Sequence, residues 1–168
     1  MTVKLFRALI LSTFFAAIAF AETPHQNAVD ALNELLRGQH AAVETYTQAL
    51  EKLGGYSDAD PLFAALLDHK AAAAATIKEI TRLGGAATPT SGVWGAWAQA
   101  VTGGAKLLGN KAALKVLKEG EEHGIEEYEE ILNQGEVAST FKEQTKTNFL
   151  PNQKKHIAAL DRLMTPLS

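Results

Sequence analysis

Two residues in the first third of the chain, His40 and Glu44, have side chains that can bind a metal ion and lie four positions apart. On an α-helix that spacing puts both on one face. With Val43 taken as the centre of the buried face, His40 lies about 60° from it and Glu44 about 100°. If the chain turns at Gly54-Gly55, His69 on the next helix falls at the height of Glu44. The sequence therefore favours either a single-metal site of His40, Glu44 and His69 for iron, zinc or manganese, or a structural network of the same groups.

A second candidate residue, Glu121, falls on an apolar stripe, in line with Leu114 and Leu132. A buried carboxylate needs a partner, because burying it alone costs several kcal/mol or forces it neutral. We therefore expect Glu121 to have a perturbed pKa and to serve as a hydrogen-bonded structural residue or as a metal ligand. The candidate partners are Gln39, Tyr46, Tyr128 and His156.

The rest of the third helical segment and the composition exclude several functions. Glu126, Glu127, Glu129 and Glu130 are expected to form an acidic outer face, which serves solubility or, alternatively, weak cation capture. The chain has no cysteine, which excludes disulfides and thiol chemistry, and no Ser/His/Asp arrangement or phosphate-binding glycine loop is indicated. A net charge of −3 without a basic stripe argues against nucleic-acid binding.

The N-terminal residues have the form of a secretory signal peptide. Lys4 and Arg7 precede a short apolar run, Ala8 to Ala19, and Ala19-Phe20-Ala21 fits a signal-peptidase site. Cleavage there would leave one domain, residues 22–168, in an exported, periplasmic protein with no stable membrane insertion. An uncleaved N-terminal anchor is the alternative.

Four segments have helical periodicity: 26–53, 60–83, 111–133 and 139–164. Pro151 is expected to kink or split the last of them. Residues 84–109 are too long for a tight turn, so we interpret them as a crossover with a short helix of its own. Trp94 and Trp97 in this crossover are expected to cap one end of the core, or alternatively to stack on a ligand. Short loop, long crossover and short loop predict an all-α, ferritin-like four-helix bundle made of two hairpins.

A short internal echo supports this pairing of hairpins. RGQHAAVETY (37–46) and EGEEHGIEEY (119–128) share a glycine, a β-branched aliphatic residue, a glutamate and a tyrosine at the same spacing. The histidine is not shared. What repeats is therefore mainly a packing unit.

The motifs, taken in order, resemble a family of bacterial four-helix-bundle proteins of unknown function, related to the ferritins and rubrerythrins. The resemblance covers about residues 28–164. It is carried by Gly38-Gln39, Arg82-Leu83-Gly84-Gly85, Ser91-Gly92, Thr102-Gly103-Gly104, Glu119-Gly120-Glu121-Glu122 and Gln153-x-x-His156.

The resemblance implies a ferritin-like fold, and in that superfamily two metals are held by one Glu on each of two helices and Glu-x-x-His on the others. This chain departs from the pattern, with Gln39, Leu66-x-x-His69 and Gln153-x-x-His156 in these places. A standard di-iron oxidase centre is therefore not expected. The leading hypothesis is a non-catalytic envelope protein for stress-related interaction or sequestration, with dimerisation through the alanine-rich second helix as a further expectation. The alternative is a metal-binding protein or residual oxidoreductase that uses His40, Glu44, His69, Glu121 and His156.

Overall fold

The computed structural model describes residues 24–53, 59–96 and 110–165. Three long helices, α1 (Pro24–Leu53), α2 (Ala59–Arg82) and α4 (Asn110–Asn133), are followed by a fourth rod. That rod consists of α5 (Ser139–Gln144), a π-helical turn η2 (Thr145–Phe149) and α6 (Leu150–Met164), and a single 3₁₀ turn, η1 (Gly92–Trp94), lies in the crossover. The described residues contain no β-strand, so the all-α prediction is confirmed. The predicted helix ends differ from these by at most two residues.

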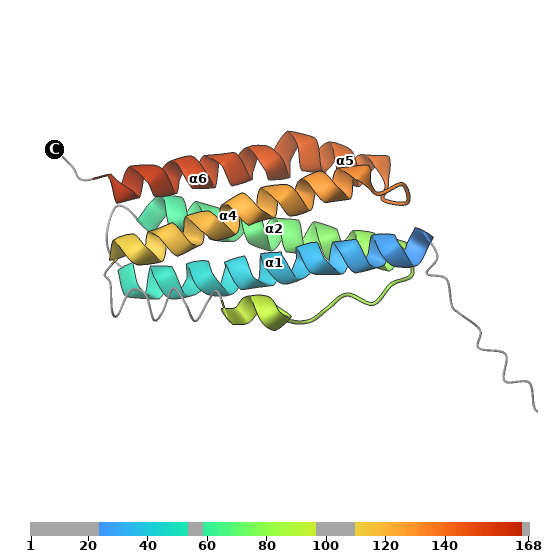
Figure 1. Ribbon diagram of the computed structural model, residues 1–168, viewed down its shortest axis with the longest axis horizontal. Coiled ribbons are helices and arrows are strands. Elements are labelled where there is room, and N and C mark those ends of the chain that lie inside the picture. Colours follow the sequence, from blue (N-terminus) through green and yellow to red (C-terminus); the bar gives the residue numbers. More distant parts are fainter. Residues whose placement is uncertain (1–23, 54–58, 97–109, 166–168) are drawn as a thin grey trace, which may run out of the picture.

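The four rods lie side by side as a bundle (Figure 1). α1 packs against α2 and α4, and α6 packs against the same two helices. α1 and α6 run in one direction and α2 and α4 in the other. One long connection, between α2 and α4, therefore has to travel the length of the bundle. None of the helices within the described ranges is long and apolar enough to cross a membrane.

The described part of the crossover is fastened to the outer face of α1. Asn33 donates to the carbonyl of Ala86 over 3.0 Å and accepts from the backbone N–H of Thr88 over 2.7 Å. Further along α1, Glu34 accepts a hydrogen bond from Nε1 of Trp94 over 2.6 Å. These contacts place η1 beside the middle of α1 (Figure 1).

The turn that starts the crossover depends on glycine. Gly84 has a φ of +75°, and the N–H groups of Gly84 and Gly85 donate to the carbonyls of Thr81 and Ile80. This is a Schellman helix end, in which a left-handed glycine satisfies the last carbonyls. A Cβ on Gly85 would lie 2.6 Å from a methyl group of Val29, so only glycine allows the chain to pass this close to α1.

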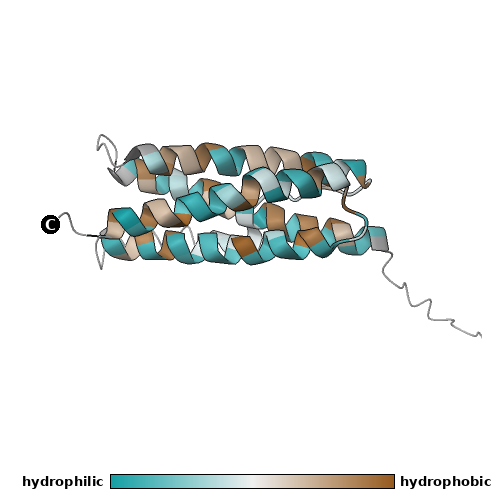
Figure 2. Ribbon diagram, turned by 90° about the horizontal axis from the view of Figure 1, so that it is seen from above, coloured by the Kyte–Doolittle hydropathy of each residue, from teal (hydrophilic) through white to brown (hydrophobic). Residues whose placement is uncertain are grey.

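The interior consists of two apolar clusters separated by a polar layer. One cluster joins Leu32, Leu36 and Ile80 to Phe141 and Phe149. The other cluster contains Tyr46, Leu62, Leu114, Leu117 and Leu160. Figure 2 shows hydrophobic and hydrophilic residues alternating along the helices, as amphipathic helices require. Each rod contributes buried polar residues that lie, along the chain, between its members of the two clusters: Gln39, His69, Glu121, Gln153 and His156.

The fourth rod is irregular near Pro151, as the sequence predicts. The irregularity is a π-helical turn, and the rod continues through it without a break. Phe141, Thr145, Phe149 and Gln153 are all buried although they follow each other at four-residue steps. On a regular α-helix three such steps would rotate the side chains by about 120°. The wider π turn removes much of this rotation, so Phe141 and Gln153 face the same interior.

Candidate metal centre

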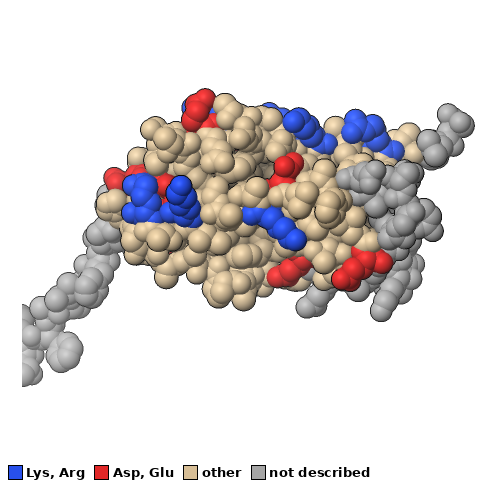
Figure 3. Space-filling model, turned by 180° about the vertical axis from the view of Figure 1, so that it is seen from behind, with Lys and Arg blue, Asp and Glu red and all other residues tan. Residues whose placement is uncertain are grey.

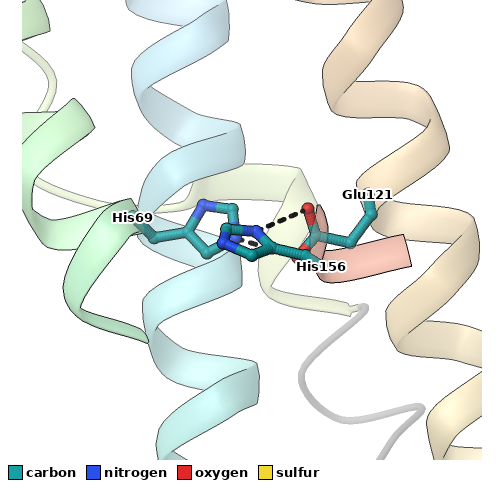
Figure 4. A group of neighbouring side chains, drawn as sticks. All are labelled: His69, Glu121 and His156. Atoms are coloured by element: carbon teal, nitrogen blue, oxygen red, sulfur yellow. Dashed lines mark hydrogen bonds and ion pairs between the residues drawn. The ribbon is translucent and has the colours of Figure 1, made fainter. Parts of the chain in front are cut away.

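Three buried side chains from three different helices meet in the polar layer: His69 from α2, Glu121 from α4 and His156 from α6 (Figure 4). Nε2 of His69 lies 3.0 Å from Oε1 of Glu121, and Nδ1 of His156 lies 3.3 Å from Oε2. One potential ligand atom of each residue lies within 4.8 Å of the others. Within the described part of the chain, these are the His, Asp and Glu residues whose ligand atoms lie close enough together to hold a metal ion.

Each imidazole is oriented by an oxygen atom on its far side. Nδ1 of His69 lies 2.9 Å from Oε1 of Gln39, and Nε2 of His156 lies 3.1 Å from Oδ2 of Asp68. Because amide and carboxylate oxygens accept, these outer nitrogens donate, and a protonated ring also donates from its inner nitrogen to Glu121. The inner nitrogen of each ring is thereby directed at Glu121, which is the arrangement that neighbouring acceptors give to metal-binding histidines.

Glu121 is held from two further sides. The hydroxyl of Tyr46, on α1, donates to Oε1 of Glu121. On α6, Nε2 of Gln153 donates to the backbone carbonyl of Glu121 over 3.1 Å. All four rods therefore contribute to holding one carboxylate, and two of the partners expected from the sequence, Tyr46 and His156, are confirmed.

The electrostatics keep Glu121 ionised although it is buried. Burial favours its neutral form, but the charge of His69 and hydrogen bonds from His156 and His69 outweigh burial and lower the pKa of Glu121 to about 2. Burial opposes charge on His156 too, yet the hydrogen bond to Glu121 raises the pKa of that imidazole. Burial and the adjacent carboxylate raise the pKa of Tyr46 well above its usual range, so its hydroxyl remains a donor. The perturbed pKa expected for Glu121 is confirmed.

His40 and Glu44 do not join this group. Nε2 of His40 lies 3.2 Å from the carbonyl oxygen of Thr88, and Glu44 accepts from the hydroxyl of Ser91 over 3.0 Å. The expected trio of His40, Glu44 and His69 therefore does not form, and the first two residues fasten the crossover. The reason is a rotation of α1: its buried face is centred near Gln39 and Tyr46, about 40° from the Val43 axis that the sequence suggested.

The chain matches the model of one protein family, described as a domain of unknown function (DUF2383), over residues 27–134. That span is more than half of the 168 residues. The chain belongs to this family. No curated protein and no solved structure matches it.

The residues of the candidate centre lie partly inside and partly outside the DUF2383 region. His69 and Glu121 lie within residues 27–134, together with the orienting residues Gln39 and Asp68. His156 and Gln153 lie on α6, beyond the matched residues. The last rod therefore completes a site whose other parts lie in the DUF2383 region.

A pocket of about 60 Å³ lies between α1 and α4 and reaches the centre. His69, Glu121 and Tyr46 line its inner part, and Trp94, His123 and Glu127 line the rest. The ring of Trp94 lies 4.6 Å from that of His123, centroid to centroid, so Trp94 lines a side pocket instead of capping an end of the core. Trp97, the other tryptophan expected in that role, lies outside the described residues.

The prediction that four glutamates of α4 form an exposed acidic face is wrong for one of them. Glu126, Glu129 and Glu130 are exposed, but Glu127 is buried against α1. A Cβ on Gly38 would lie 2.6 Å from Oε2 of Glu127, so the glycine makes room for this carboxylate. The residue in the sequence that permits this close approach of α4 to α1 is therefore Gly38.

Sequence reasoning also missed Asp68, which is partly exposed and orients His156. No pattern marks it, because its partner is 88 residues away. The echo, in contrast, corresponds to a structural equivalence. Tyr46 and Tyr128 are both 1% exposed, and the residues that follow the two glycines, Gln39 and Glu121, are both 2% exposed.

Proposed function

We propose that this protein is a ferritin-like bundle that binds one divalent first-row transition metal ion at His69, Glu121 and His156. One observation carries the proposal: two imidazoles direct their inner nitrogens at the same buried carboxylate while their outer nitrogens are held by Gln39 and Asp68. Neighbouring acceptors of this kind orient ligands and raise their basicity. The ferritin-like kinship is supported by the helix directions and by the single long crossover between α2 and α4.

The donor set limits the metal. Two imidazole nitrogens and one carboxylate oxygen suit zinc or iron(II), with manganese less favoured, and leave coordination positions for water or another ligand. Such an ion would supply Lewis acidity or, if it is iron, electron transfer. The chain's own contribution is to bury the ligands, orient both imidazole rings and open His69 and Glu121 to the pocket.

One ion fits this chain better than two. The resemblance to the ferritin superfamily implies carboxylates at the positions of Gln39, Leu66 and Gln153, where this chain has two amides and a leucine. Gln39 and Gln153 are instead engaged in orienting His69 and Glu121. With three carboxylates absent, the ligands that remain are those for a single ion.

A purely structural network of the same residues is the competing function, and metal stoichiometry separates the two. The protein is freed of metal with a chelator, incubated with Zn(II) or, without oxygen, with Fe(II), passed through a desalting column and analysed for bound metal. We expect about one ion per chain in the wild type and none retained in Glu121→Gln or His69→Ala. His40→Ala is the matched control and should retain the ion.

The outcomes of this experiment are distinct. A wild type that retains no metal overturns the proposal and leaves the structural network. Loss of metal in His40→Ala would place the site elsewhere. Circular dichroism of each variant checks that the bundle has folded.

A partner-binding role is favoured by a separate observation on α2. Phe63 and Leu67 are about half exposed and Ile77 more than a third, on the same side of the helix. The face seen from behind in Figure 3 is mostly uncharged surface, with separate Lys/Arg and Asp/Glu patches spread over it. We propose that α2 pairs with α2 of a second copy of the chain. We also propose that residues 1–21 are removed on export and that the pairing takes place in the periplasm. Light scattering of the wild type against Phe63→Glu tests the pairing.

A further inference from the structure

Glu127 has a buried carboxylate that the candidate metal centre does not use. It lies on α4 about 9 Å along the helix axis from Glu121. The residue is only 9% exposed, and Oε1 has no hydrogen-bond partner among the described residues. The ring of His123 lies beside it, with Nε2 3.6 Å from Oε1 of Glu127. A buried acceptor of this kind is costly unless something donates to it.

The surroundings of this carboxylate are negative. Burial, followed by the charges of Glu34 on α1 and Glu130 on α4, raises the pKa of Glu127 to about 8. Arg37 is paired with Glu34 over 2.6 Å, so its charge is already matched. An anionic ligand would be repelled by Glu127 and Glu121, which both line the pocket, whereas a cation would be attracted to them.

Part of the wall of the pocket beside Glu127 is apolar. Ala41, Ala42, Val116 and Leu117 line it, and the Trp94 ring lies at its side. A volume of about 60 Å³ holds several water molecules or a ligand of a few heavy atoms. A Cβ on Gly120 would meet nothing within 4 Å, so this glycine leaves part of the space open.

We propose that the pocket between α1 and α4 binds a small primary alkylammonium ion. Its ammonium group donates to Oε1 of Glu127, and its short chain lies against Ala41, Ala42, Val116 and Leu117. The carboxylate supplies the charge-assisted hydrogen bond, and the apolar walls exclude longer polar ligands. An aromatic ring at the side of the pocket also favours a cation over an anion. Binding needs no metal at Glu121.

Three ligands of equal length test the charge that the pocket selects: n-butylammonium, 1-butanol and butyrate. Calorimetric titration at about pH 9 keeps a primary amine protonated, with a pKa near that of lysine at about 10.4, while Glu127 is ionised. We expect saturable 1:1 binding of n-butylammonium and binding of the other two weaker by about tenfold or more. Equal binding of 1-butanol, or no saturable binding of n-butylammonium, overturns the proposal.

Two variants test the location. Glu127→Gln should weaken n-butylammonium about tenfold or more and leave 1-butanol unchanged. Glu129→Gln, an exposed glutamate on the same helix, is the matched control for charge and should change neither. Gly120→Leu should fill the pocket and abolish binding of both ligands. Wild-type affinity for n-butylammonium in Glu127→Gln or in Gly120→Leu places the ligand elsewhere and overturns the proposal.

Discussion

Nδ1 of His69 lies 2.9 Å from Oε1 of Gln39, so a residue on α1 fixes which nitrogen of a histidine on α2 faces Glu121. Gln39 stands where the resemblance to the ferritin superfamily implies a carboxylate ligand. In this chain it acts on the centre through His69. The amide therefore orients a histidine of the candidate centre.

Gln39→Leu should lower the affinity for Zn(II) by about 10–100-fold while leaving the three ligands in place, because orienting partners typically contribute this much. Competition against a chelating indicator measures the change. Gln144→Leu, at an exposed position of α5, is the control. An unchanged affinity in Gln39→Leu would show that the hydrogen bond to His69 does not support metal binding.

Tyr46→Phe should reduce the free energy of unfolding by about 1–3 kcal/mol, because it removes a donor to a buried, ionised carboxylate. Urea denaturation measures this loss. The double variant with Glu121→Gln should lose less than the sum of the single variants, since both changes remove the same bond. Strictly additive losses would contradict the coupling.

Glu127 should make the fold less stable as the pH rises from about 4.5 to about 8. In this window the unfolded chain has Glu127 ionised and the folded chain has it protonated, so the folded state binds more protons. Each pH unit in the window therefore costs about 1.4 kcal/mol, and the loss is complete above the folded pKa. Urea denaturation across the window, with the difference taken against Glu127→Gln, isolates this effect. An equal pH dependence in the two proteins would contradict burial of the carboxylate, and Glu129→Gln should behave as the wild type.

Gly120→Ala and Gly124→Ala should change stability in opposite directions although they lie one helical turn apart. At Gly120 the new methyl group meets nothing within 4 Å, so the gain in helix propensity, about 0.5–1 kcal/mol, should appear as stabilisation. At Gly124 it would overlap the amide of Gln153, which donates to Glu121, and we expect a loss of about 1–3 kcal/mol. Thermal unfolding of both variants checks the signs, and stabilisation by Gly124→Ala would contradict the packing of α4 against α6.

Local signals in the sequence were enough for the helices and for part of the site. Gly84 lies at a helix end in the structure, and Pro151 lies next to the π-helical turn of the fourth rod. Both effects are local, because glycine permits a φ above zero and proline lacks a backbone N–H in any fold. Glu121 was found as a buried carboxylate because it falls on an apolar stripe. The sequence pattern predicts the wrong α1 residue beside His69. An error of about 40° in the direction of the buried face of α1 places His40 there, whereas the structure has Gln39 in that position.

The sequence by itself determined the helices, their approximate ends and the need of Glu121 for partners, because these follow from periodicity and from the cost of burying charge. Only the tertiary structure decided that His69 and His156 are those partners, that Asp68 orients one of them and that Glu127 is buried. These relationships join residues up to 88 positions apart. They depend on how the four rods rotate and approach one another, which no single helix encodes in its own pattern.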